Sequence, residues 1–246
     1  MHTLSLRDCK KLTDKSMYEV AELRSLTYLD VSMTKIADDG AAAISRLPNL
    51  TSLNLFLNYN ITVRGYEALG SMPALTHLNV SACFSNTDAC LYALSGLHGL
   101  RHLDMGSWSD RLTHKALDTL SNFPYLTYLS LEGNKSLTAV EGMNALAALT
   151  SLQTLKLMDC GMVTNESLRM LSGLHQLQTL TLGAGAKTRA STLTTLAPLR
   201  GLESLRCVTL THCKYMTDDG LSMLPKHVQV NHSYGCDKIK GTYGCE

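Results

Sequence analysis

The chain has 246 residues with 22 basic and 21 acidic side chains, a formal net charge of +1, and 6% of its residues are aromatic. A near-neutral chain without a basic stripe is a poor match to proteins that bind nucleic acid through its phosphates, and few aromatic rings argue against base stacking. We therefore expect no nucleic-acid partner. No run of eighteen apolar residues occurs and no hydrophobic signal core begins the chain, so we also expect no membrane span.

Leucine supplies 45 of the residues, and its spacing carries the main structural signal. The segment Leu26-Thr-Tyr-Leu29-Asp-Val31 has an L-x-x-L-x-L pattern that returns at steps of 24 to 26 residues. The later copies begin at Leu50, Leu75, Leu100, Leu126, Leu152 and Leu177. Such a period is typical of leucine-rich repeats, which are built from one strand and one helix each. The spacing therefore predicts a repeat fold and not an ordinary globular core.

Each repeat is predicted to pass from a short strand, through a turn, into a helix. Alternation in the L-x-L core places one side of the strand inside the stack and the other outside. Apolar residues three and four apart predict helices over 39–47, 65–72, 89–97, 115–123, 142–149, 165–174 and 219–224. Stacking of the units buries a continuous apolar core. We expect an α/β solenoid, a curved right-handed stack of about nine repeats with a parallel sheet on the concave face and helices on the convex face.

The two ends of the chain are less regular than its middle. Residues 1–25 read as a partial N-terminal repeat without a clear cap, and 225–246 as a C-terminal strand followed by a cap or tail. The segment 202–210 allows two strand registers three residues apart, of which the second fits better because Cys213 follows it at the repeat spacing. We expect 1–246 to form a single repeat domain.

The eight cysteines are an even number, which permits disulfides, but their positions favour another interpretation. Cys9, Cys83, Cys160 and Cys213 occupy one repeat position, where other repeats carry Asn58 and Asn134. A small polar side chain at this position can pair buried backbone groups of the turn, so we predict an internal ladder of reduced thiols and amides. Reduced thiols predict a cytoplasmic location, with the nucleus as an alternative. A zinc site in the Cys- and His-containing C-terminal segment is the competing interpretation, although no Cys-x-x-Cys pair is present.

Motifs for catalysis are weak or absent in the sequence. The segment Leu182-Gly-Ala-Gly-Ala-Lys187-Thr188 follows a predicted strand, but its glycines do not have the spacing of a phosphate-binding loop. No His-Glu-x-x-His or Gly-x-Ser-x-Gly motif occurs. His77, His102 and Asp104 fall on neighbouring strands, yet adjacent strands bring any two such residues close together. We therefore expect a protein that is not an enzyme and that has no cofactor and no metal.

A binding surface is predicted on the outward side of the strands, which is the usual binding face of such a stack. Aromatic and polar-tipped side chains concentrate there in the N-terminal and middle repeats, as they do in protein interfaces. The candidate partner-binding residues are Tyr28, Asp30, Asn54, Phe56, His77, Asn79, His102, Asp104, Tyr128, Glu132, Lys156 and Met158. Trp108 falls at the ladder position, where it is either buried in place of the ladder residue or exposed beside this patch.

The ladder cysteines are accompanied by segments such as Met216-Thr-Asp-Asp-Gly-Leu221 and Val163-Thr-Asn-Glu-Ser-Leu168. In this the chain resembles the cysteine-containing leucine-rich-repeat class known from F-box proteins, which are substrate receptors of ubiquitin ligases. The resemblance implies a module that binds a protein partner, and it makes the substrate-recognition part of a ubiquitin ligase one specific possibility. The alternative is a structural subunit that assembles through its repeat ends. As an isolated domain we expect a monomer.

Overall fold

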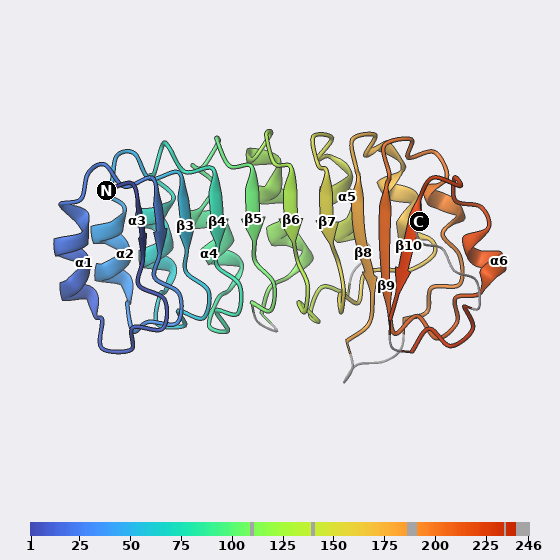
Figure 1. Cartoon of the computed structure of the whole chain (residues 1–246), viewed down its shortest axis with the longest axis horizontal. Helices are drawn as coiled ribbons and strands as arrows, with labels where there is room; N and C mark the ends of the chain where they lie inside the picture. The colour runs from blue at the N-terminus through green and yellow to red at the C-terminus, as the bar shows by residue number, and fades with distance from the viewer. Residues whose placement is uncertain (109–110, 139–140, 186–190, 234, 240–246) are drawn as a thin grey trace. The chain divides into compact units, whose positions relative to one another are not determined.

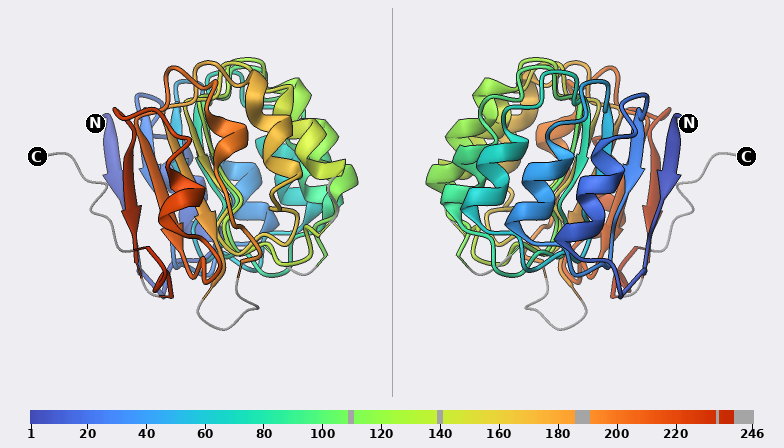
Figure 2. Two further views of the ribbon diagram at one scale, coloured as in Figure 1. Left: turned by 90° about the vertical axis from the view of Figure 1, so that its right-hand side faces the viewer. Right: turned by 90° about the vertical axis from the view of Figure 1, so that its left-hand side faces the viewer.

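Short parallel strands alternate with helices along the chain in the structure, a computed structural model that describes residues 1–108, 111–138, 141–185, 191–233 and 235–239. The chain divides into two compact units, Met1–Leu126 and Thr127–Glu246. Within each unit the strands form one layer and the helices another, as Figures 1 and 2 show. No helix among the described residues is long and apolar enough to cross a membrane.

The first unit contains five parallel strands in chain order. They are β1 (Thr3–Ser5), β2 (Tyr28–Asp30), β3 (Ser52–Asn54), β4 (His77–Asn79) and β5 (His102–Asp104). The helices of this unit are α1 (Asp14–Ala21), α2 (Asp38–Ile44), α3 (Val63–Leu69), α4 (Asp88–Ala93) and the 3-10 helix η1 (His114–Asn122).

The second unit has the same architecture. Its strands are β6 (Tyr128–Ser130), β7 (Thr154–Lys156), β8 (Thr179–Gly183), β9 (Cys207–Thr211) and β10 (Gln229–His232). Its helices are α5 (Glu141–Ala147) and α6 (Asp218–Leu221), with the 3-10 helices η2 (Ser167–Gly173) and η3 (Ala197–Leu199).

The strand register follows the leucine repeat. Leu29 pairs with Leu53 and Leu53 with Leu78, so equivalent leucines lie beside one another and point into the core. In the second unit Leu180 pairs with Val208, which confirms the second of the two registers considered for this segment. The α/β repeat fold expected from the spacing is therefore the observed fold.

Two predicted helices differ in type from the expectation. Segments 115–123 and 165–174, predicted as α-helices, are the 3-10 helices η1 and η2. Large apolar side chains such as Leu117, Leu120 and Phe123 recur every three residues, a spacing that suits both helix types and does not separate them. Helix α1 was not among the predicted helices, although Met17, Val20 and Ala21 form its buried face.

The ladder expected from the cysteine and asparagine positions is confirmed by the buried Asn58, Asn134, Cys83, Cys160 and Cys213, whereas the prediction is wrong for Cys9, which is exposed at the first repeat. The Asn58 amide nitrogen donates to the Val31 carbonyl at 2.8 Å, and its Oδ1 accepts from the Thr34 N–H at 3.1 Å. The Cys160 thiol donates to the Leu131 carbonyl with a Sγ–O distance of 3.0 Å. Because these groups lie in the interior, each bond satisfies a carbonyl or N–H that water cannot reach.

The residue that precedes the ladder position has a left-handed backbone in most repeats. Its φ lies between 51° and 78° at Asp8, Met33, Leu57, Ala82, Ser107, Gly133, Asp159 and His212. A residue with a side chain pays about 1–2 kcal/mol for this conformation. In return its N–H points along the stack, as when Leu57 donates to the Ser81 carbonyl at 3.1 Å. The turn therefore links each repeat to the next.

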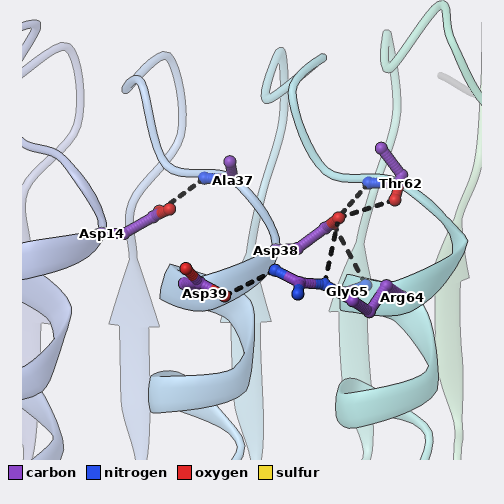
Figure 3. A network of polar contacts seen from close by, with 7 residues as sticks. All are labelled: Asp14, Ala37, Asp38, Asp39, Thr62, Arg64 and Gly65. Atoms are coloured by element: carbon purple, nitrogen blue, oxygen red, sulfur yellow. Dashed lines mark hydrogen bonds and ion pairs between the residues drawn. The ribbon is translucent and has the colours of Figure 1, made fainter.

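A second connection between repeats lies at the start of the helices (Figure 3). The Asp14 carboxylate accepts from the Ala37 N–H of the next repeat, with an Oδ1–N distance of 2.7 Å. Asp38 repeats the contact one step further along and accepts from the N–H groups of Thr62 and Gly65 at 2.7 and 3.1 Å. Both aspartates thereby satisfy N–H groups that the first turn of a helix leaves unpaired.

Candidate functional site

The outward face of the strands in the first unit carries seven of the twelve predicted binding residues in positions that alternate with the buried leucines, and Phe56 lies two residues after the end of β3. Three columns of side chains run across this face, one before, one between and one after the two apolar positions of each repeat. They differ in how much of each side chain is available to a partner.

The central column has a structural role that differs from the predicted role in partner binding. In each member a side-chain oxygen accepts a hydrogen bond from the backbone N–H two residues ahead. Asp30 Oδ1 accepts from the Ser32 N–H at 2.9 Å, and Asn54 Oδ1 accepts from the Phe56 N–H at 3.0 Å. Asn79 and Asp104 make the same contact at 2.9 and 3.1 Å. An Asp or Asn two residues before a turn is the sequence signal for this motif, because its short side chain can imitate a backbone turn. These four side chains hold the turn that follows each strand.

The first column supplies the accessible aromatic surface of the face. The imidazole rings of His77 and His102 stack with centroids 5.6 Å apart and an angle of 23° between their planes. Thr76 Oγ1 lies 2.8 Å from His77 Nδ1 and fixes the orientation of that ring. His77 is exposed, whereas Tyr28 and His102 are half-buried.

The third column is uneven. Phe56 is half-buried and is the one large apolar side chain in this column of the first unit. Ser32 occupies the same column but is fully buried, and its hydroxyl has no hydrogen-bond partner in the described structure. Tyr28, Phe56, His77 and His102 thus remain as the candidate contact residues of the first unit.

The second unit presents its own group of predicted residues. Tyr128, Glu132, Lys156 and Met158 are all half-buried. The Lys156 ammonium lies 5.6 Å from the centre of the Tyr128 ring, a cation–π contact between neighbouring strands β6 and β7. This group combines an aromatic ring, both signs of charge and a thioether.

Of the two placements considered for Trp108, the structure shows the buried one. It is fully buried at the ladder position, and its indole N–H donates to the Val80 carbonyl at 2.7 Å. Its ring meets Tyr66 edge to face, with centroids 5.9 Å apart. The tryptophan replaces the smaller ladder residue of other repeats and contributes nothing to the exposed face.

The raised pKa values of the buried thiols indicate that these cysteines have a structural role. Burial raises the pKa of Cys83 to about 11 and that of Cys213 to about 12, and it also raises the pKa of Cys160. A thiol with a raised pKa stays protonated near neutral pH, so it acts as a hydrogen-bond donor and is a poor nucleophile or metal ligand. Among the described residues no group of three or more His, Cys, Asp or Glu side chains could hold a metal ion.

The C-terminal cysteines that raised the zinc alternative have other contacts in the described part of the chain. Cys236 is buried, its sulfur accepts from the Cys213 N–H at 3.4 Å, and it lies 3.8 Å from the Leu210 carbonyl. Asn231 donates to the Cys207 sulfur at 3.3 Å. Cys245 lies outside the described residues, as do Lys187 and Thr188 of the segment compared with a phosphate-binding loop.

A cavity of about 470 Å³ lies in the second unit beside the turn that follows β7. An ion pair between Lys135 and Asp159, with a 3.8 Å N–O distance, lines it together with the Cys160 thiol. The described lining includes no histidine that could activate this thiol as a nucleophile.

Comparisons with known proteins agree with this geometry. Two leucine-rich-repeat family profiles match the chain, one over residues 4–83 and the other over 148–172 and 201–224. A search of curated proteins gives no match. Among solved structures, the internalin InlF of Listeria monocytogenes is 22% identical with a TM-score of 0.66, over 88% of this chain and 57% of the internalin. The chain thus spans little more than half the length of that protein.

A second Listeria monocytogenes structure, internalin C2, is also 22% identical, with a TM-score of 0.62 over 85% of this chain and 80% of the internalin chain. At this level of identity the likeness concerns the fold alone. The repeat spacing, the strand register and these matches together identify the chain as an α/β solenoid of leucine-rich repeats.

Proposed function

We propose that this chain is a module that binds a protein partner on the sheet face of its first unit. The observation that carries the proposal is the stacked His77–His102 pair on β4 and β5, which shares the outward face of the sheet with the half-buried ring of Tyr28 on β2. Such rings contribute large contact areas at a small cost in conformational entropy, and they are enriched where binding energy concentrates.

The support beneath these side chains favours binding without rearrangement. The turn after each strand is fixed by Asn54, Asn79 and Asp104 and by backbone bonds to the next repeat. A surface that is already ordered loses little entropy when a partner binds. The second group, Tyr128 with Lys156, Glu132 and Met158, extends the proposal to a contact surface on the second unit.

We propose no catalytic role for the chain. The described groups with shifted pKa values are Tyr66, Cys83, Cys90, Cys160 and Cys213, and burial is the largest cause in each case. These groups lie in the core and in the ladder, where a neutral side chain is the stable form. A recognition role fits them better than nucleophilic chemistry.

The ladder thiols also support an intracellular location and the F-box-like context as finer proposals. Cys83 and Cys160 donate their S–H to backbone carbonyls, so this structure needs the reduced form that the cytoplasm and nucleus maintain. A substrate-recognition role in a ubiquitin ligase predicts that ligase subunits purify with the full-length protein. Imaging of the tagged protein tests the location separately.

The experiment compares two double variants that each remove exposed or half-buried rings. Phe56→Ala/His77→Ala alters the sheet face, and the matched control Tyr18→Ala/Tyr92→Ala alters the exposed side of helices α1 and α4. Quantitative affinity purification from cells should show partners that are lost from the sheet-face variant and retained by the control. Circular dichroism checks that both variants are folded. Retention of every partner by the sheet-face variant would contradict the proposal.

A further inference from the structure

A second exposed surface lies outside the sheet face, at the position immediately after the ladder residue of each repeat. In the first unit this position carries Lys10, Lys35, Tyr59 and Phe84, and all four side chains are exposed. We name these four residues the turn strip. The turn strip lies outside the strand columns that carry the predicted binding residues.

Backbone geometry places the four side chains in one row. Each follows a ladder residue, and that residue in turn follows a left-handed residue with φ between 56° and 60°, namely Asp8, Met33, Leu57 and Ala82. The N–H of Met33 donates to the Phe56 carbonyl at 2.8 Å and that of Leu57 to the Ser81 carbonyl at 3.1 Å. Equal turns joined by equal bonds repeat at about the strand spacing of 4.8 Å. The strip therefore runs across successive repeats with Lys10 at one end and Phe84 at the other.

The aromatic end of the strip is open to solvent. Tyr59 and Phe84 are 55% and 59% exposed, and they occupy the same position in adjacent repeats. At two other exposed tyrosines a cation covers one ring face, as Arg46 does at Tyr18 and Arg101 at Tyr125. The described residues place no such cation over Tyr59 or Phe84. Paired exposed rings are a common anchor for protein partners.

The other end of the strip is basic. Lys35 makes no ion pair within the described structure, and Lys10 is 73% exposed at 3.5 Å from the Asp8 carboxylate. The same position in the described repeats of both units contains no acidic residue. Its occupants are Lys10, Lys35, Tyr59, Phe84, Lys135, Gly161 and Lys214. A partner that follows this row therefore meets positive charge and apolar rings, and it meets one carboxylate, that of Asp8, beside Lys10.

We propose that the turn strip binds an extended acidic segment of a partner protein. Apolar side chains of the segment pack on Tyr59 and Phe84, and its carboxylates pair with the ammonium groups of Lys35 and Lys10. Complementary charge sets the orientation of the segment along the row, and the buried ring area supplies most of the affinity. This surface is separate from the histidine pair of the sheet face, so one chain can engage a partner at both places.

The test uses a fluorescein-labelled peptide in which a run of glutamates is followed by two phenylalanines, with fluorescence anisotropy as the readout. Saturable binding to the whole chain is expected, and it should weaken as salt screens the charges. A peptide with lysine in place of glutamate, and another with alanine in place of phenylalanine, should bind at least about tenfold more weakly. Absence of saturable binding by the first peptide would overturn the proposal.

Variants of the chain assign the site. Tyr59→Ala/Phe84→Ala and Lys10→Glu/Lys35→Glu should each raise the Kd for the acidic peptide about tenfold or more. The control Tyr92→Ala removes a ring that is 47% exposed on helix α4, and Phe56→Ala/His77→Ala alters the sheet face; both should bind like the unchanged chain. Because all the altered side chains are exposed or half-buried, thermal unfolding should change little.

Two outcomes would assign the strip to something else. Equal peptide binding by the unchanged chain and by Tyr59→Ala/Phe84→Ala places the peptide elsewhere and refutes the inference. Light scattering that shows a dimer of the unchanged chain, lost in the same variant, identifies a second copy of the chain as the occupant and refutes it as well. Loss of binding in the sheet-face variant alone would support the histidine face and not the turn strip.

Discussion

The Asp38 carboxylate holds the backbone of Thr62 in the next repeat, with an Oδ1–N distance of 2.7 Å and a second bond from the Thr62 hydroxyl to Oδ2, also 2.7 Å (Figure 3). The first residue of one helix thereby caps the start of the next. Asp88 makes the same pair of contacts with Thr113 at 2.7 and 2.6 Å. In the second unit Asn165 Oδ1 likewise accepts from the Thr194 N–H at 3.0 Å, but there the amide nitrogen donates to the Thr194 hydroxyl at 2.7 Å.

Removing the Asp38 side chain should lower the free energy of unfolding. Asp38→Ala leaves the N–H groups of Thr62 and Gly65 without their carboxylate acceptor, and we expect a cost of about 2–3 kcal/mol. Asp38→Asn should cost less, since an amide makes the equivalent contact at Asn165. Urea unfolding followed by circular dichroism measures both. The neighbouring Asp39→Ala is the control, because its side chain is 61% exposed and its pair with Arg64 contributes little. Equal losses at positions 38 and 39 would contradict this account.

Val63 occupies the position of Asp38 in the following repeat and interrupts the series of caps. Val63→Asp should supply a carboxylate to the Thr87 N–H and hydroxyl, as Asp88 does for Thr113, and raise the free energy of unfolding by about 0.5–1 kcal/mol. Val63→Ala controls for the lost valine contacts. Thr87→Ala in the Val63→Asp background should remove part of the gain. A gain that is unchanged by Thr87→Ala would show that the hydroxyl contributes nothing and would assign the effect to the backbone N–H and the helix dipole.

Trp108 should behave as an interior residue in spectroscopy and in stability. As the only tryptophan, it should emit at short wavelength and resist quenching by iodide until the chain unfolds. Trp108→Phe removes the 2.7 Å bond to the Val80 carbonyl and reduces the buried area, and we expect a loss of about 2–3 kcal/mol. The exposed ring of Tyr125 gives a comparison, since Tyr125→Phe should change stability by less than about 0.5 kcal/mol. Strong iodide quenching of the folded chain would show that the indole is not buried.

Stability should fall at alkaline pH in a way that depends on Cys83. Burial raises the pKa of this thiol from 9.0 to about 11, so the folded chain retains a proton that the unfolded chain releases. Its contribution is therefore fully present below pH 9 and is lost as the pH rises towards 11, by about 2–3 kcal/mol. The free energy of unfolding at pH 8, 9.5 and 11 should decline more steeply for the unchanged chain than for Cys83→Ala. The exposed Cys9 provides the control, and Cys9→Ala should keep the full slope.

The periodic positions of the fold are predictable from the sequence because every repeat solves the same local problem. Leu29, Leu53 and Leu78 alternate with outward residues, and a register error of one residue would turn all of them to solvent. The ladder follows from the same regularity, since only a few side chains can pair the buried carbonyls of the turn. The helix type in η1 and η2 does not follow, because leucines three residues apart suit both geometries.

The candidate site is less predictable, because its side chains are divided between structure and surface by contacts that the pattern does not specify. Asp30 and Asn54 occupy outward strand positions as predicted, yet each accepts from the N–H two residues ahead, and Asp30 is buried and unavailable to a partner. Tyr59 and Phe84 lie outside the strand columns. They form part of one proposed binding surface only because the stacked turns bring them into one row.

The sequence by itself therefore determined the repeat, the buried leucines and the register, since a fixed period of 24–26 residues and the alternation of a strand leave one arrangement that buries them. The tertiary structure decided which polar side chains bind the neighbouring repeat. Asp38 and Thr62 are 24 residues apart, and Trp108 and the carbonyl of Val80 are 28 apart. Such pairs form only after the repeats stack, because the stack alone brings their atoms within hydrogen-bond distance.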